Sequence, residues 1–109
     1  MATVFLVSES PNHNTTGALR YGDKVVAILP PNQQIAFSTV PTIRRIERAL
    51  ENFCDEDYLL LTGDPACIGI ACAIASKNNN GRYKCLKWDR RERIYIPIEI
   101  DIRKEKDNG

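Results

Sequence analysis

The sequence predicts an α/β fold: a single compact domain over residues 1–102, with a mixed β-sheet, two helices and a flexible tail at 103–109. Three observations lead to this fold class. Residues 58–62 form a short apolar run, typical of a strand covered on both faces. An uncharged helical segment follows it, and an alternating apolar strand lies near the C-terminus. The expected order of elements is β-β-(β)-α-β-α-β-β.

The first half of the chain supplies two strands, Thr3–Ser8 and Lys24–Leu29, whose apolar runs indicate buried positions. Residues 9–22 between them are rich in turn formers and predict a long loop. This loop holds His13, the single histidine of the chain. An imidazole suits proton transfer, but the flanking asparagines are typical of a loop that reaches solvent.

A short edge strand and a helix come next. Residues 35–38 are expected to add the edge strand, and Pro41 to open the helix. Apolar residues recur along this helix with helical spacing, and arginines and glutamates occupy its other face. An acidic turn at residues 54–57 then leads into the central strand, and we expect solvent to surround it rather than a cation.

The centre of the chain is a strand–turn–helix corner. Gly63 allows a sharp exit from the strand, Asp64 is a favourable N-cap, and Pro65 suits the first helical position. The helix over residues 65–77 is uncharged up to its last position. We therefore expect it to be the most buried helix, apolar on all sides.

The C-terminal part predicts a β-hairpin, with strands at 82–88 and 93–102 joined by a turn at 89–92. In the second strand isoleucines alternate with polar and aromatic residues, so we expect the isoleucines to face the core. Pro97 cannot donate a backbone hydrogen bond, which places this strand at a sheet edge or at a bulge. An edge strand in so small a domain also suggests a homodimer formed by twofold pairing.

Composition excludes several function classes. The net charge of +1 predicts no strong attraction of the whole chain to polyanions, although residues 58–109 are more basic than residues 1–57. The four cysteines lack Cys-x-x-Cys spacing, and with one histidine no metal site is expected. We interpret them as small buried thiols of a reducing compartment. The chain shows neither a signal sequence nor a membrane-length apolar run, so a cytoplasmic location without membrane contact is expected.

The strand–turn–helix corner is one candidate ligand site, because open α/β sheets bind ligands beyond the carboxyl ends of their strands. Its chemistry is poor for phosphate, since Asp64 adds negative charge and Pro65 lacks an amide donor. We therefore favour a structural N-cap role for Asp64. The alternative is a nucleotide- or nucleic-acid-binding protein, or a small hydrolase, that uses Gly63, Asp64 and His13.

The hairpin is the second candidate site. Residues 82–95 hold six basic and two acidic residues, interleaved with Tyr83, Trp88 and Tyr95. This composition fits a protein-binding hot spot, a surface that tracks nucleic acid, or an ordinary hairpin whose tryptophan covers the core edge. We expect a partner-binding surface made of the aromatic and basic residues around the turn: Trp88, Arg90, Arg91, Arg93 and Tyr95.

Three stretches carry a family resemblance: residues 58–65 (YLLLTGDP), 86–91 (LKWDRR) and 95–100 (YIPIEI). With them, residues 20–102 resemble a set of small proteins encoded by tailed bacteriophages. The set brings no established activity, so no functional residue is carried over. The resemblance implies a small protein made inside an infected bacterium, where many short phage products bind and redirect a host component.

From the residues themselves, neither a nucleophile–base pair, a metal cluster nor a phosphate loop can be assembled. The sequence therefore favours a binding protein without a cofactor over an enzyme. Its expected partner is a host protein, with nucleic acid as the alternative.

Overall fold

The computed structural model describes residues 2–10, 16–31 and 38–103. These residues form one sheet in the order β2-β1-β3-β4-β5. The strands are β1 (Thr3–Ser8), β2 (Lys24–Leu29), β3 (Tyr58–Leu60), β4 (Arg82–Asp89) and β5 (Ile94–Asp101). The first four are parallel, and β5 runs antiparallel to β4. The helices are α1 (Thr39–Ala49), α2 (Pro65–Asn78) and the short 3-10 helix η1 (Thr16–Arg20). A mixed sheet with two α-helices confirms the predicted fold class.

Three predictions concern residues outside the described part of the chain. The short edge strand expected at 35–38 lies there except for Ser38, as does His13. The expected tail lies there from residue 104 onward. The loop expected at 9–22 is described from residue 16, where it contains η1 instead of irregular backbone.

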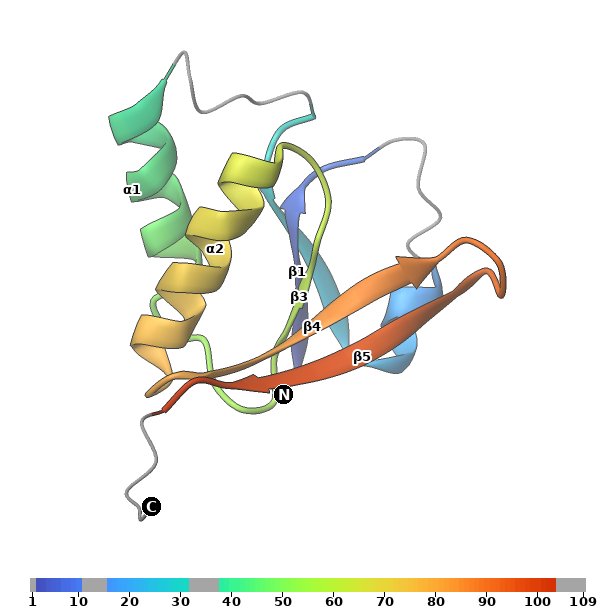
Figure 1. Ribbon diagram of the computed structural model, residues 1–109. Coiled ribbons are helices and arrows are strands. Elements are labelled where there is room, and N and C mark those ends of the chain that lie inside the picture. The colour runs from blue at the N-terminus through green and yellow to red at the C-terminus, as the bar shows by residue number, and fades with distance from the viewer. Residues whose placement is uncertain (1, 11–15, 32–37, 104–109) are drawn as a thin grey trace.

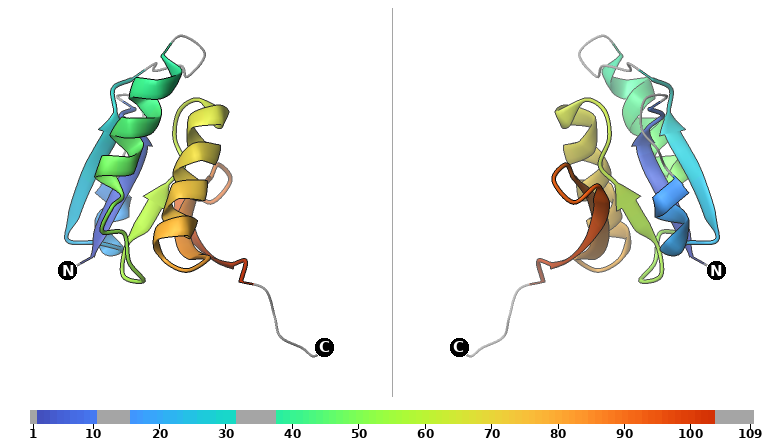
Figure 2. Two further views of the ribbon diagram at one scale, coloured as in Figure 1. Left: turned by 90° about the vertical axis from the view of Figure 1, so that its left-hand side faces the viewer. Right: turned by 90° about the vertical axis from the view of Figure 1, so that its right-hand side faces the viewer.

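Both α-helices pack on the same face of the sheet, α1 against β2 and α2 against β4 (Figures 1 and 2). The 3-10 helix η1 lies at the opposite face and contacts both β2 and β5. Packed helices are about 8–10 Å apart and paired strands about 4.8 Å, so two helices cover about four strands. In the described part of the chain, β5 is the strand that the α-helices cover least: Ile100 packs against the helix-side core, and the other isoleucines of β5 are exposed.

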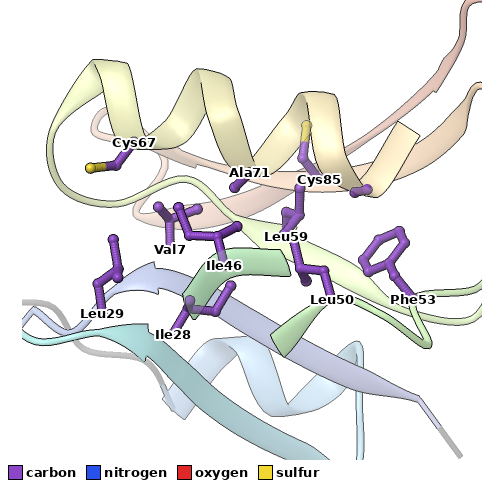
Figure 3. Close-up of a cluster of buried hydrophobic side chains, with 11 residues drawn as sticks. Val7, Ile28, Leu29, Ile46, Leu50, Phe53, Leu59, Cys67, Ala71 and Cys85 are labelled. Atoms are coloured by element: carbon purple, nitrogen blue, oxygen red, sulfur yellow. The ribbon is translucent and has the colours of Figure 1, made fainter. Parts of the chain in front are cut away.

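The core has two parts, one on each face of the sheet. On the helix side, residues of both helices meet Val7, Leu59 and Cys85 (Figure 3). On the other side, Ala18 of η1 meets a second set of apolar residues: Val4, Leu6, Leu60, Leu86 and Tyr95. Leu59 and Leu60 are neighbours in β3 and fall in different parts of the core, so β3 is covered on both faces as predicted.

The strand β5 departs from the prediction over most of its length. Its isoleucines lie on the helix side, where Ile100 is partly buried against the core. However, Ile94, Ile96 and Ile98 are exposed by 48%, 39% and 37%, whereas Tyr95 on the other face is only 4% exposed. The cause is η1, which packs on the tyrosine side: Ala18 of η1 lies in the same part of the core as Tyr95, and Tyr21, the residue after η1, donates its hydroxyl to the Tyr95 carbonyl over 3.2 Å. Alternation predicted a strand with two distinct faces, but the element that buries one of them lies in the segment expected to be a loop.

The helix α2 is the more buried of the two α-helices, as predicted, but it is not covered on all sides. Its inner face buries small residues, among them Cys67, Ala71 and Ala75. Ala66, Gly69 and Ala73 on its outer face are exposed. The helix layer is the outermost layer on this side of the sheet, so an uncharged helix face remains open to solvent.

The strand–turn–helix corner forms as predicted. Gly63 has a φ of 99°, in the left-handed region that favours glycine. Asp64 caps α2 by accepting a hydrogen bond from the Ala66 amide over 3.1 Å, and Pro65 is the first helical residue. At the other end, Gly81 with a φ of 85° donates its amide to the Ser76 carbonyl over 2.7 Å.

The residues Ser8 and Thr62 join the end of β1 to this corner. The Ser8 amide donates to the Thr62 hydroxyl oxygen over 3.2 Å, and the Thr62 hydroxyl donates to the Ser8 carbonyl over 2.6 Å. Ser8 also fills the space beside Gly63, where an added Cβ would lie 2.7 Å from the Ser8 Cβ. Glycine is therefore required at residue 63 by both its conformation and its packing.

The acidic turn departs from the prediction at one residue. Asp55 and Glu56 are exposed as expected, but Asp57 is buried. Its carboxylate accepts hydrogen bonds from the Thr3 amide over 2.9 Å and from the Cys54 amide over 3.1 Å. Asp57 thus ties the first residue of β1 to the turn that leads into β3.

The four cysteines are free thiols. Cys67 and Cys85 are buried and Cys72 is partly buried, as predicted, whereas Cys54 is exposed. Burial raises the pKa of the Cys72 and Cys85 thiols, and it raises the pKa of Tyr83, which packs in the same part of the core, to about 12. These thiols remain protonated at neutral pH, which fits a packing role.

The corner can be tested with a matched pair of glycine variants. Gly63→Ala should lower the free energy of unfolding by about 2 kcal/mol or more, because a Cβ is strained at this φ and meets Ser8. Gly69→Ala should raise it by about 0.5–1 kcal/mol, because alanine favours the helix and nothing lies within 4 Å of an added Cβ. Urea unfolding followed by circular dichroism measures both. Equal effects of the two variants would contradict this account of the corner.

The buried carboxylate gives a second prediction. Asp57→Ala should cost about 1–3 kcal/mol of unfolding free energy, because two backbone amides lose their acceptor. The control is Asp23→Ala at an exposed position, which should change stability by less than about 0.5 kcal/mol. Urea unfolding measures the stability of both variants. An unchanged unfolding midpoint for Asp57→Ala would show that the two amides find other acceptors.

Candidate functional site

The β4–β5 hairpin carries different side chains on its two faces. Its register pairs Asp89 with Ile94, Lys87 with Ile96 and Cys85 with Ile98. These pairs lie on the helix side, because Cys85 belongs to the core part beneath α2. The intervening pairs, such as Trp88 with Tyr95, lie on the side of η1.

The two aromatic residues of the predicted binding surface support the fold. The rings of Trp88 and Tyr95 meet edge to face, with centroids 4.9 Å apart and planes inclined by 61°. Tyr95 is buried, and Trp88 is partly buried in the same part of the core. Burial also raises the pKa of the Tyr95 hydroxyl. Tyr95 therefore offers no ring to a partner, and Trp88 offers part of one.

The three arginines of the predicted surface are exposed, as expected. Asp89 shapes the turn that carries them, since its Oδ1 atom accepts from the Arg91 amide over 2.9 Å and from the Glu92 amide over 3.3 Å. The Arg93 amide donates to the Asp89 carbonyl over 2.8 Å, with Arg93 at a φ of 56°. The turn holds Arg90, Arg91 and Arg93 outward through its own hydrogen bonds.

Other basic residues of the hairpin are engaged within the fold. Arg82 lies 3.3 Å from Asp55 in an ion pair. The Lys84 ammonium lies 4.3 Å from the centre of the Tyr58 ring. The basic residues of β4 therefore do not form one continuous track along the hairpin.

A groove of about 580 Å³ opens on the helix side near the end of the hairpin. It is lined by Leu61, Lys87, Trp88, Asp89, Arg90 and Ile96. Ile94 and Ile98 flank Ile96 along β5 on the same face. We call Lys87, Arg90, Ile94, Ile96 and Ile98 the hairpin surface. It combines an exposed apolar row with two cations, and of these residues the sequence had pointed to Arg90 alone.

A larger groove of about 720 Å³ lies between the two α-helices. It is lined mainly by charged side chains of both signs, Arg44, Glu47 and Arg48 of α1 and Glu51 just after it, together with Ile74 and Lys77 of α2. Side chains of both charges line this groove, whereas the hairpin surface carries an exposed apolar row and cations alone, so the hairpin surface is the better candidate for a protein partner.

At the corner of Gly63 and Asp64, the side chains make contacts within the fold. One carboxylate oxygen of Asp64 caps α2, and the Cys67 thiol lies 3.9 Å from the other. The Ser8 hydroxyl is buried against Gly63 and has no hydrogen-bond partner among the described residues. These contacts stabilise the strand–turn–helix connection. His13, the residue expected to act with Asp64 in the alternative function, lies outside the described residues.

Within residues 2–10, 16–31 and 38–103, no three His, Cys, Asp or Glu side chains are grouped so that they could bind a metal ion. Over the same residues, neither α-helix combines the length and the apolar character that crossing a membrane requires.

Comparison with known proteins gives one match. A family model described as Phage Pam3 gp32-like protein matches residues 2–102. The match confirms the resemblance to phage proteins and extends it over the first strand and the segment that follows, which the resemblance had left out. Neither the curated proteins nor the solved structures contain a match. The chain belongs to the Phage Pam3 gp32-like protein family.

Proposed function

We propose that this phage accessory protein binds a host protein, in the cytoplasm of the infected cell, through the hairpin surface. The observation that carries the proposal is the row of three isoleucines on β5, each exposed by more than a third. Contiguous apolar side chains on a soluble surface are characteristic of interaction sites. Lys87 and Arg90 beside the row supply the polar rim that such sites have.

The surface fits a protein better than a nucleic acid. Binding of single strands relies on aromatic rings on which bases stack, and Tyr95 is buried. Arg82 and Lys84 make contacts within the fold, so the basic residues do not line a groove that could follow a phosphate backbone. The exposed isoleucines favour a partner that buries apolar side chains.

The alternative function, nucleotide binding or hydrolysis at the corner, has weaker support. Its main group, the Asp64 carboxylate, accepts the capping hydrogen bond of α2. The capping role is sufficient to explain why an aspartate occupies this position, and no ligand is needed for the explanation.

Capture from a lysate of the host bacterium tests the proposal. We expect the wild type to retain a host protein after nuclease treatment. The double variant Arg90→Glu with Ile96→Ser should weaken retention by about thirtyfold, which corresponds to the 2 kcal/mol of a hot spot. Arg90 is exposed, but Ile96 is only 39% exposed, so we expect the variant to unfold at a lower temperature than the wild type and to remain folded at the temperature of the capture, which circular dichroism checks.

A matched control changes the same residue types elsewhere. Val40→Ser with Arg44→Glu alters an exposed apolar residue and an exposed arginine on α1, and should leave retention unchanged. Loss of the partner on nuclease treatment would indicate nucleic acid instead. Equal retention by both double variants would place the working surface elsewhere. Trp88→Ala is unsuitable for this purpose, because it also removes the ring that packs on Tyr95.

A further inference from the structure

We infer that the partner contributes an amphipathic helix with acidic residues along its edge, which docks over β4 and β5 beside α2 as a third member of the helix layer. The inference rests on the proposed function and names the kind of partner that the hairpin surface fits. Four features support it: the vacant position in the helix layer, the flank of α2, the blocked edge of β5 and the charge at the groove.

The helix layer has room for one more helix. In the described structure, α1 packs against β2 and α2 against β4. Ile100 of β5 packs against the core beneath α2, and the three isoleucines before it in β5 are exposed. Packed helices lie about 8–10 Å apart, or about two strand spacings. A helix placed one such distance from α2 would therefore lie over the isoleucine row.

The flank of α2 that borders this position is uncharged. Cys72 and Tyr83 of β4 both pack against the helix-side core, so this side of α2 faces the hairpin. Ile68 lies one turn before Cys72 on that same side and is partly exposed. Gly69 and Ala73 lie next to them on the outer face, and an added Cβ at Gly69 would meet nothing within 4 Å. These small side chains allow a neighbouring helix to come close.

The edge of β5 is blocked, which leaves its face for binding. The Ile102 amide donates to the Gly81 carbonyl over 2.8 Å, so even-numbered residues of this strand direct their backbone groups toward β4. Pro97 therefore faces the free edge, as predicted, and lacks the amide that an added strand needs. A partner strand, or a second copy pairing by its own β5, would lose a hydrogen bond at the centre of the strand.

The charge around the row selects an acidic partner. Lys87 is cross-strand to Ile96, and Arg90 lines the same groove. The groove's one carboxylate, that of Asp89, accepts two backbone amides of the turn and offers less to a cation. Glutamates at the edge of a docked helix would lie near both cations.

Two designed helical peptides test the inference with the full-length protein. They share one leucine and alanine stripe and differ in the flanking residues, which are glutamates in one and lysines in the other. At low salt, the glutamate peptide should bind at least about tenfold more tightly, and added salt should reduce the difference. Fluorescence anisotropy of the labelled peptides measures the two affinities. In ¹⁵N NMR spectra of the protein, binding of the glutamate peptide should shift the amide signals of β5 and of Gly69 and Ala73.

Single variants separate the apolar and ionic contributions. Ile96→Ser should weaken binding of the glutamate peptide by about tenfold, in line with a buried isoleucine at an interface. Lys87→Glu should remove the preference for glutamate. The control Lys24→Glu, at an exposed position on the far edge strand β2, should preserve it.

Several results would overturn the inference. They are equal binding of the two peptides, no binding of either, and shifted signals confined to other elements. A light-scattering mass of about twice 12.3 kDa that Ile96→Ser returns to the monomer value would assign the row to a second copy of the chain. If a host protein is captured through the hairpin surface and neither peptide binds, the proposed function stands and the helical partner is rejected.

Discussion

The difference between the spacing of packed helices and the spacing of paired strands determines which part of this sheet is covered. Two helices cover about four strands, and the described chain has five strands in its sheet. The strands β2, β1, β3 and β4 therefore all contribute buried residues to the core beneath α1 and α2, while β5 contributes only Ile100 at its border. On the opposite face, η1 buries Tyr95 and leaves the alternate residues of β5 on the open side. The exposed isoleucines follow from these two arrangements together.

Local chemistry allowed much of the fold to be predicted from the sequence. The exit at Gly63, the cap at Asp64 and Pro65 at the start of α2 are local effects, and each forms as expected. The face of β5 that is buried could not be predicted, because alternation is symmetrical between the two faces. The deciding residues, Gly17, Ala18 and Tyr21, lie in a segment whose composition indicated a loop. The numbers of predicted elements do indicate an open face, because two helices cover about four strands and the sequence predicts more than four.

The candidate site was predicted only in part, for a related reason. The turn and its outward arginines depend on hydrogen bonds that the Asp89 carboxylate accepts from the amides two and three positions later, which the sequence indicates. The roles of Trp88 and Tyr95 depend on long-range packing against η1, so their part in the core was not apparent. Lys87 belongs to the hairpin surface because it pairs with Ile96 across the two strands, and this pairing depends on the register of the hairpin.

Energetics explain why the isoleucine row alone is too small to bind a partner. Full burial of an isoleucine side chain contributes about 1.5–3 kcal/mol, and these three are already more than half buried, so together they offer about 2–4 kcal/mol. Association costs about 4 kcal/mol or more in lost translational and rotational freedom. Stable binding therefore needs further contacts, and two sources adjoin the row: the uncharged flank of α2 at Gly69 and Ala73, and the cations Lys87 and Arg90. A partner that lies along α2 reaches both at once, whereas one that adds a strand at the Pro97 edge reaches neither.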